Sequence, residues 1–156
     1  VSKLFVRERK EFLQKYFKKE LFFTDVEGNT KEEVLKNLCR KVEQEKGLPE
    51  TFTASVLKRE ELTPTDYGNL VALPHPERAF QERAFVAVAV LKEPIFWFRQ
   101  KVQVVFLTAI GREEDENLQQ FYEATTDLIL RPADVQNLIR HPDYDRLIQL
   151  LRRAEE

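Results

Sequence analysis

One histidine stands out as a candidate reactive group. His75 lies between Pro74 and Pro76, directly after the short apolar run 70–73. Each proline pushes the residue before it out of the α region, so the imidazole is held on a stiff, extended segment. Histidine can be a neutral nucleophile near pH 7, and functional groups gather at the carboxyl ends of strands in α/β sheets. Taken alone, these residues fit a reactive histidine and a structural histidine equally well.

The other side chains that could do chemistry have structural explanations. The only cysteine, Cys39, shares the apolar face of a predicted helix, where a thiol behaves as a small hydrophobe. His141 precedes Pro142 at a predicted helix end, a place that suits a histidine capping backbone carbonyls. The two serines are Ser2 and Ser55, and Ser55 falls inside a predicted helix, so a serine-hydrolase elbow is excluded.

The sequence lacks the common motifs for nucleotides and metals. Its four glycines are too far apart to form a Gly-x-Gly-x-x-Gly turn or a Walker loop. Its two histidines are distant from each other in the sequence and are accompanied by no cysteine cluster, so they do not form a metal-binding motif. We therefore expect neither a cofactor nor a metal.

The composition indicates one folded unit of 156 residues, of which 42% are hydrophobic and 33% charged. A net charge of −2 gives no general attraction to nucleic-acid phosphates or anionic lipid. The single cysteine agrees with a reducing compartment, and the longest apolar run, 84–91, is far shorter than the roughly 20 residues of a membrane span. We expect a cytoplasmic domain that itself binds no nucleic acid and enters no membrane.

The first third of the chain is predicted to be mostly helical. Residues 1–20 have apolar side chains at helical spacing and form a lead-in helix or a linker from an upstream module, and 21–23 is a brief strand. A capping box, Thr30-x-x-Glu33, begins the clearest helix, and Gly47 ends it. Because the chain starts at Val1 and contains no methionine, we expect residues 21–156 to be one module of a longer protein.

The segments around His75 follow from turn and strand signals. A second helix over roughly 50–60 leads into the turn-rich loop 63–69, which feeds a short strand over 70–73. This strand stops at the Pro-His-Pro sequence, because proline cannot continue a sheet ladder. We therefore expect the loop, the strand and its end to hold the chemistry.

The rest of the chain predicts the fold class. The valine-rich runs 84–91 and 102–110 are typical of strands buried on both faces. The acidic stretch 113–116 suits the start of a helix, and prolines begin two short helices at about 132–140 and 142–153. This alternation favours an α/β fold, a three-layer α/β/α sandwich with a mixed, largely buried central sheet flanked by helices.

The region before His75 resembles a known active site. Residues 57–75, LKREELTPTDYGNLVALPH, are similar to the active-site region of fructose/mannitol-type (type 2) enzyme IIA domains of the sugar phosphotransferase system. The similarity continues in 86–95, VAVAVLKEPI, then in Trp97 and in 101–107, KVQVVFL. It covers nearly the whole chain from about residue 21 onward.

The resemblance implies roles for particular residues. His75 would accept a phosphoryl group on Nε2 from phosphorylated HPr, the small phosphocarrier of the system, and could pass it to a IIB domain. Arg59 matches the family arginine that stabilises the phosphoryl group; the alternative is a surface arginine at a helix end. Thr63 and Thr65 could donate hydrogen bonds to the phosphate or serve ordinary turn chemistry.

Two departures from the family pattern affect the expected function. Pro76 replaces the glycine that usually follows the active histidine, and Asn117, before Leu118, takes the place of a second histidine that transport members carry. Asparagine can hydrogen-bond phosphate but cannot shuttle a proton. Both changes resemble the C-terminal IIA-like domains of BglG-type transcription antiterminators and activators. The resemblance implies a regulatory phosphoacceptor with upstream regulatory domains; the alternatives are a transport IIA component and a non-catalytic binding module with a structural His75.

Overall fold

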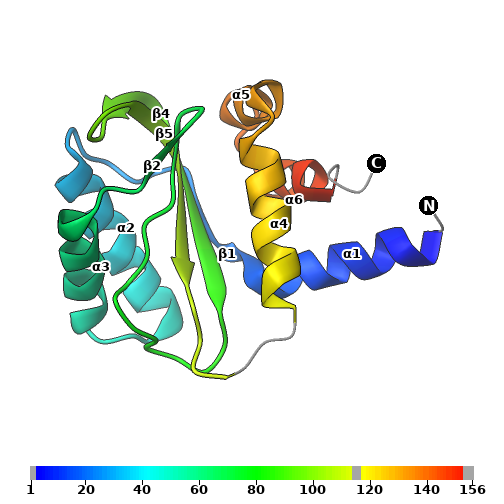
Figure 1. Ribbon diagram of the computed structural model, residues 1–156, viewed down its shortest axis with the longest axis horizontal. Coiled ribbons are helices and arrows are strands. Elements are labelled where there is room, and N and C mark those ends of the chain that lie inside the picture. The colour runs from blue at the N-terminus through cyan, green and yellow to red at the C-terminus, as the bar shows by residue number, and fades with distance from the viewer. Residues whose placement is uncertain (1–2, 114–116, 153–156) are drawn as a thin grey trace.

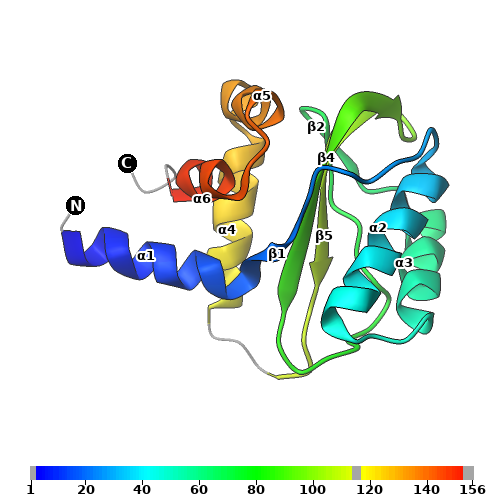
Figure 2. The same cartoon turned by 180° about the vertical axis from the view of Figure 1, so that it is seen from behind.

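The computed structural model describes residues 3–113 and 117–152, and side-chain environments from residue 10 onward. A five-stranded sheet lies between two layers of helices (Figures 1 and 2). The elements are α1 (Lys3–Tyr16), β1 (Phe17–Phe23), α2 (Lys31–Lys46), α3 (Thr51–Leu62), β2 (Asp66–Gly68), β3 (Val71–Ala72), β4 (Phe85–Phe96), β5 (Lys101–Ala109), α4 (Leu118–Ile129), α5 (Pro132–Arg140) and α6 (Tyr144–Arg152). None of the described helices combines the length and the apolar character needed to cross a membrane.

The sheet has the order β1-β4-β5-β3-β2 and is mixed, as predicted. β1 runs parallel to β4 and β3 runs parallel to β5, whereas β4 and β5 are antiparallel neighbours. Because β3 and β5 are parallel, their carboxyl ends lie at the same edge of the sheet. The segment after β3, which carries His75, therefore meets the end of β5.

Both faces of the central strands are buried, which confirms the prediction made from their valine-rich sequences. Alternate residues such as Val88 and Phe106 pack in the cluster beneath α1, α4, α5 and α6. The residues between them, such as Ala89 and Leu107, pack beneath α2 and α3. Figure 2 shows these two helical layers on opposite sides of β4 and β5.

The predicted limits of α2 are confirmed. The Thr30 hydroxyl accepts the Glu33 N–H at 3.2 Å, and the Glu33 carboxylate accepts the Asn29 N–H at 2.9 Å. The reciprocal bond of the capping box thus reaches the residue before the cap instead of the cap itself. Gly47 ends the helix at φ 65°, and its N–H donates to the Glu43 carbonyl.

The start of the chain differs from the sequence-based expectation. The strand predicted at 21–23 begins at Phe17, so the expected domain boundary after residue 20 falls inside β1. Tyr16 stacks on Phe121 of α4 with ring centroids 4.9 Å apart, and Leu13 is completely buried. The charged residues 18–20 hide this strand in the sequence, because they face solvent at the sheet edge.

Smaller differences concern the turns. The loop 63–69 contains β2, which pairs antiparallel with β3 and shortens the predicted 70–73 strand to two residues. β4 continues through Pro94 to Phe96, with irregular pairing to β5 beyond Val90. α6 begins at Tyr144, two residues after the proline that was expected to start it. Of the acidic stretch 113–116, residues 114–116 lie outside the described part of the chain.

Candidate functional site

His75 lies on the extended segment 73–76, called the strap below, at the carboxyl end of β3. The Leu73 N–H donates to the Thr65 carbonyl at 3.0 Å, and the Pro74 carbonyl accepts the Thr108 N–H of β5 at 3.0 Å. These bonds continue the sheet past the last residue of β3 and attach the strap on both sides. The stiffness predicted from the two prolines is thus reinforced by backbone pairing just before the histidine.

The hydrogen-bonding partner of the ring determines which nitrogen of His75 is free. Nδ1 lies 3.3 Å from the Leu73 carbonyl oxygen. A carbonyl can only accept, so Nδ1 must carry the proton if this bond forms. The neutral ring then has its lone pair on Nε2. This tautomer is the one that a nucleophilic histidine attacking through Nε2 requires.

A cavity of about 250 Å³ adjoins the half-buried His75 ring. It is lined by residues from the His75 strap, from the end of β5 and from α4: Leu73, His75, Thr108, Ile110, Phe121, Tyr122, Thr125 and Thr126. At its rim, Ile110 is 47% and Tyr122 37% exposed. Burial raises the pKa of the Tyr122 hydroxyl, which therefore stays a protonated donor near neutral pH. The cavity thus adjoins a ring that is neither fully buried nor fully exposed.

The residues predicted to assist His75 occupy the neighbouring helix end and loop. Arg59 lies in the last turn of α3, and its Nη1 donates to the Thr63 carbonyl at 2.9 Å. Thr63 is exposed, whereas both donors of Thr65, the N–H and the hydroxyl, bond the Glu60 carboxylate. Arg59 and Thr63 are outside the lining of the His75 cavity. Because Glu60 accepts both donors of Thr65, this residue has no donor left for a phosphate in this structure.

Asn117 lies apart from His75. It precedes α4 and accepts the Phe121 N–H through its carbonyl, one turn before the residues that line the His75 cavity. It lines a separate hollow of about 450 Å³, together with the basic side chains of Lys15, Lys18 and Arg83 among others. The structure therefore brings Tyr122 of α4 to the His75 cavity, whereas Asn117, which precedes α4, lines another hollow.

Several cavity residues could not be assigned to the site from the sequence. In the sequence, Tyr122 and Thr125 show only the spacing of residues on one face of a helix. Thr108 lies in β5 and Ile110 directly follows it, and the sequence of this apolar run gives no signal beyond strand character. They reach His75 because β3 and β5 are parallel neighbours, a pairing that the sequence does not specify.

Cys39 packs in the core as expected, and His141 lies at the end of a helix as expected. Cys39 is fully buried, and this burial raises the pKa of its thiol. His141 is exposed at the end of α5, where its N–H donates to the Asn137 carbonyl. Across residues 3–113 and 117–152, no three His, Cys, Asp or Glu side chains are grouped in a way that could hold a metal ion.

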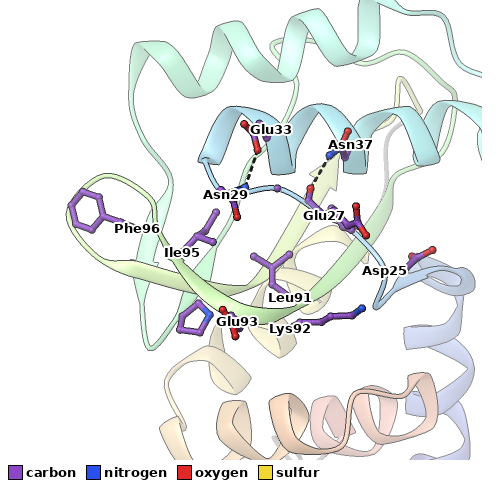
Figure 3. Close-up of a pocket in the computed structure, with 13 residues that line it drawn as sticks. Asp25, Glu27, Asn29, Glu33, Asn37, Leu91, Lys92, Glu93, Ile95 and Phe96 are labelled. Carbon is purple, nitrogen blue, oxygen red and sulfur yellow. Dashed lines mark hydrogen bonds between the residues drawn. The ribbon is translucent and has the colours of Figure 1, made fainter.

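A larger hollow, of about 860 Å³, lies between the segment 25–29, the start of α2 and the end of β4 (Figure 3). His75 does not line it. Figure 3 shows that some of its polar groups bond one another: Glu33 accepts from Asn29, and the Asn37 amide donates to the Glu27 carbonyl at 2.7 Å. These bonds hold the connection from β1 to α2.

The fold and the site define an α/β domain with a histidine just after the carboxyl end of the inner strand β3. Residues 15–154 match the family described as phosphoenolpyruvate-dependent sugar phosphotransferase system, EIIA 2. The chain therefore belongs to the type 2 IIA family of that system, which confirms the resemblance seen in the sequence.

The curated relatives are longer proteins. The chain is 37% identical over 140 residues to the probable licABCH operon regulator of Bacillus subtilis (strain 168), covering 90% of this chain and 22% of that protein. It is 27% identical over 120 residues to the transcriptional regulator ManR of the same strain, covering 77% and 18%. Multiphosphoryl transfer protein 1 of Escherichia coli (strain K12) is 25% identical over 136 residues, covering 85% and 16%. The chain thus spans about a fifth of the length of these relatives.

Solved structures confirm the fold. The complex of enzyme IIAMTL and phosphorylated enzyme IIBMTL from Escherichia coli contains a chain that matches with a TM-score of 0.71 at 19% identity, covering 86% of this chain and 97% of that one. The nitrogen regulatory protein IIA-Ntr from Neisseria meningitidis matches with a TM-score of 0.70 at 20% identity, covering 86% and 95%. At these identities the likeness supports the three-layer α/β fold.

Proposed function

We propose that this domain accepts a phosphoryl group on His75 from phosphorylated HPr and acts as the regulatory IIA domain of a transcription regulator in the cytoplasm. The observation that carries the proposal is the contact between His75 Nδ1 and the Leu73 carbonyl, because it leaves Nε2 as the nucleophile. During transfer, the N–P bond of the phosphohistidine donor breaks as the Nε2–P bond of His75 forms. No proton has to leave Nε2 in this tautomer.

The regulatory part of the proposal is supported by the curated relatives. Two of them are named as regulators, and the chain covers only about a fifth of each. We infer that upstream regulatory domains of the same protein respond to the charge that phosphorylation adds. Asn117, which replaces the family's second histidine and lies outside the His75 cavity, provides no proton shuttle for rapid onward transfer.

We assign phosphate stabilisation to Arg59. The charge of the transferring group spreads over its equatorial oxygens, and a guanidinium stabilises that charge better than it stabilises a neutral imidazole. Arg59 now bonds the Thr63 carbonyl, on the loop that leads to the His75 strap. The guanidinium has further N–H donors besides the one that bonds Thr63, and these can serve the phosphoryl group.

The phosphorylation test uses phosphoenolpyruvate, enzyme I and HPr. We expect an acid-labile, base-stable phosphate on the wild-type chain and none on His75→Ala. The matched control is His141→Ala, because His141 is exposed at the end of α5 and should not affect labelling. Failure to label the wild type, or equal labelling of His75→Ala, would refute the phosphoacceptor role and leave the non-catalytic binding module.

The role of Arg59 has its own control. Arg59→Ala should slow phosphorylation by about tenfold or more, because a charged donor to the developing phosphate is lost. Arg40→Ala, which removes an exposed arginine on α2, should leave the rate unchanged. Wild-type kinetics for Arg59→Ala would remove that residue from the site.

A transport IIA component is the second candidate function, since one relative is a multiphosphoryl transfer protein and one structural neighbour was solved with a IIB partner. The discriminating measurement is transfer from phosphorylated His75 to a IIB domain. We expect transfer much slower than that of a transport IIA domain. Equal rates would favour the transport function.

A further inference from the structure

Glu60 is a buried carboxylate close to the end of α3. It is 2% exposed, and its two oxygens accept three hydrogen bonds. The Thr65 N–H and hydroxyl both donate to it, the hydroxyl at 2.6 Å, and Trp97 Nε1 donates at 3.4 Å. A buried carboxylate is costly unless such donors satisfy it, so this residue is a strong local constraint on the loop it contacts.

The hydrogen bonds continue from Glu60 to His75. Thr65, held by Glu60, accepts the Leu73 N–H at 3.0 Å through its own carbonyl. Leu73 in turn places its carbonyl 3.3 Å from His75 Nδ1. A connected path of hydrogen bonds thus joins a side chain in the layer of α3 to the ring of His75.

We propose that Glu60 is a positioning residue that holds the Leu73 carbonyl in place and so keeps His75 in the tautomer with a free Nε2. This inference deepens the proposed phosphoacceptor function and rests on it for its kinetic consequence. Its effect on the ring itself is independent of phosphorylation. The position of the Leu73 carbonyl matters because its distance of 3.3 Å from His75 Nδ1 is already long for a hydrogen bond. A further shift would break this bond.

The free Nε2 then depends on a remote group. If the Leu73 carbonyl moves, the ring loses its preference for a proton on Nδ1, and the population of the tautomer with the proton on Nε2 rises. Misplacing a reacting group by a fraction of its contact distance lowers the rate of transfer without changing partner binding. The expected signature is therefore a lower maximal rate with an unchanged KM for the donor.

The central test compares Glu60→Leu with Glu60→Gln. Leucine fills a similar volume but accepts no hydrogen bond, whereas glutamine keeps one acceptor for the Thr65 N–H and can donate to the Thr65 hydroxyl. The ring tautomer is read from the nitrogen-15 NMR signals of His75 in the unphosphorylated chain. We expect a mixed tautomer in Glu60→Leu and a wild-type spectrum in Glu60→Gln.

Kinetics with phosphorylated HPr provide the second measurement. For Glu60→Leu we expect the maximal rate to fall by about tenfold or more with KM within about twofold of the wild type, and Glu60→Gln should restore the rate. A wild-type His75 spectrum in folded Glu60→Leu would overturn the inference. If neither the wild type nor any variant is phosphorylated, but the His75 spectrum of Glu60→Leu still differs from that of the wild type, the proposed function fails and the positioning role stands.

A second pair of variants covers the case in which Glu60→Leu does not fold. Thr65→Val removes the hydroxyl bond to Glu60 with little change in shape, and Thr63→Val makes the same change at an exposed position of the same loop. A tautomer shift in Thr65→Val but not in Thr63→Val supports the inference. Unchanged spectra in both variants overturn it.

Discussion

The buried thiol of Cys39 should make this domain less stable at alkaline pH. Its side chain is 0% exposed on the inner face of α2, among Leu35, Leu38 and Val42. Desolvation raises the pKa of the thiol far above its usual range, and the nearby charge of Glu43 raises it further. The folded protein therefore keeps this thiol protonated under conditions in which the unfolded chain ionises it.

The sign and size of the effect follow from this difference in pKa. Because the folded pKa is the higher one, the contribution is fully present below the unfolded pKa of about 8.5 and is lost as the pH rises. Near pH 10, an unfolded thiol with that pKa is mostly thiolate. Its ionisation then lowers the free energy of unfolding by about 2 kcal/mol.

The assay is urea denaturation of the wild type and of Cys39→Ala at about pH 7 and at about pH 10. Alanine has its own packing cost, which does not depend on pH. Tyr122 and Tyr144, whose hydroxyl pKa values are also raised by burial, are common to both proteins. We expect the wild type to lose about 2 kcal/mol more than the variant between the two conditions. An equal loss in both proteins would refute the reasoning.

Five further substitutions test the local structure, each by the shift of its urea midpoint. Gly111→Ala should cost about 3 kcal/mol, because the added Cβ would lie 2.3 Å from the backbone oxygen of Glu82. At Gly47 an added Cβ would meet no atom within 4 Å. Gly47→Ala should therefore cost only the roughly 1–2 kcal/mol that a left-handed φ imposes on alanine. Equal losses would contradict this steric account. Thr30→Ala should cost about 1 kcal/mol through loss of the α2 cap, and a neutral result would remove the cap from the stability argument. Asn69→Ala should cost about 1–2 kcal/mol, because Asn69 has a φ of 54° and its side-chain amide donates a hydrogen bond to the Ile129 carbonyl at the end of α4. Asn69→Gly should recover the part of this loss that comes from the backbone conformation, but not the part that comes from the hydrogen bond.

Much of the scaffold could be predicted because it depends on short-range patterns. The helix limits at Thr30 and Gly47 follow from local capping, and the two-sided burial of β4 and β5 follows from their unbroken apolar runs. The start of β1 at Phe17 could not be predicted in the same way. Its charged residues are compatible with an edge strand only because β4 pairs with it from one side.

The sequence by itself determined the family and predicted a reactive group. The long stretch of similarity shows the family, and the Pro-His-Pro context and the arginine at position 59 predict His75 as the phosphoacceptor. These are properties of adjacent residues, since proline restricts its neighbours and a family motif is contiguous.

The tertiary structure decided what surrounds that group. The parallel pairing of β3 with β5 brings Thr108 to the strap, and the packing of α4 brings Tyr122 to the cavity while leaving Asn117 in another hollow. Packing also buries Glu60, whose carboxylate accepts from Trp97 Nε1 of a distant segment. Such contacts join residues that are distant along the chain, and they form only when the elements pack, because no local preference specifies which helix or strand lies beside which.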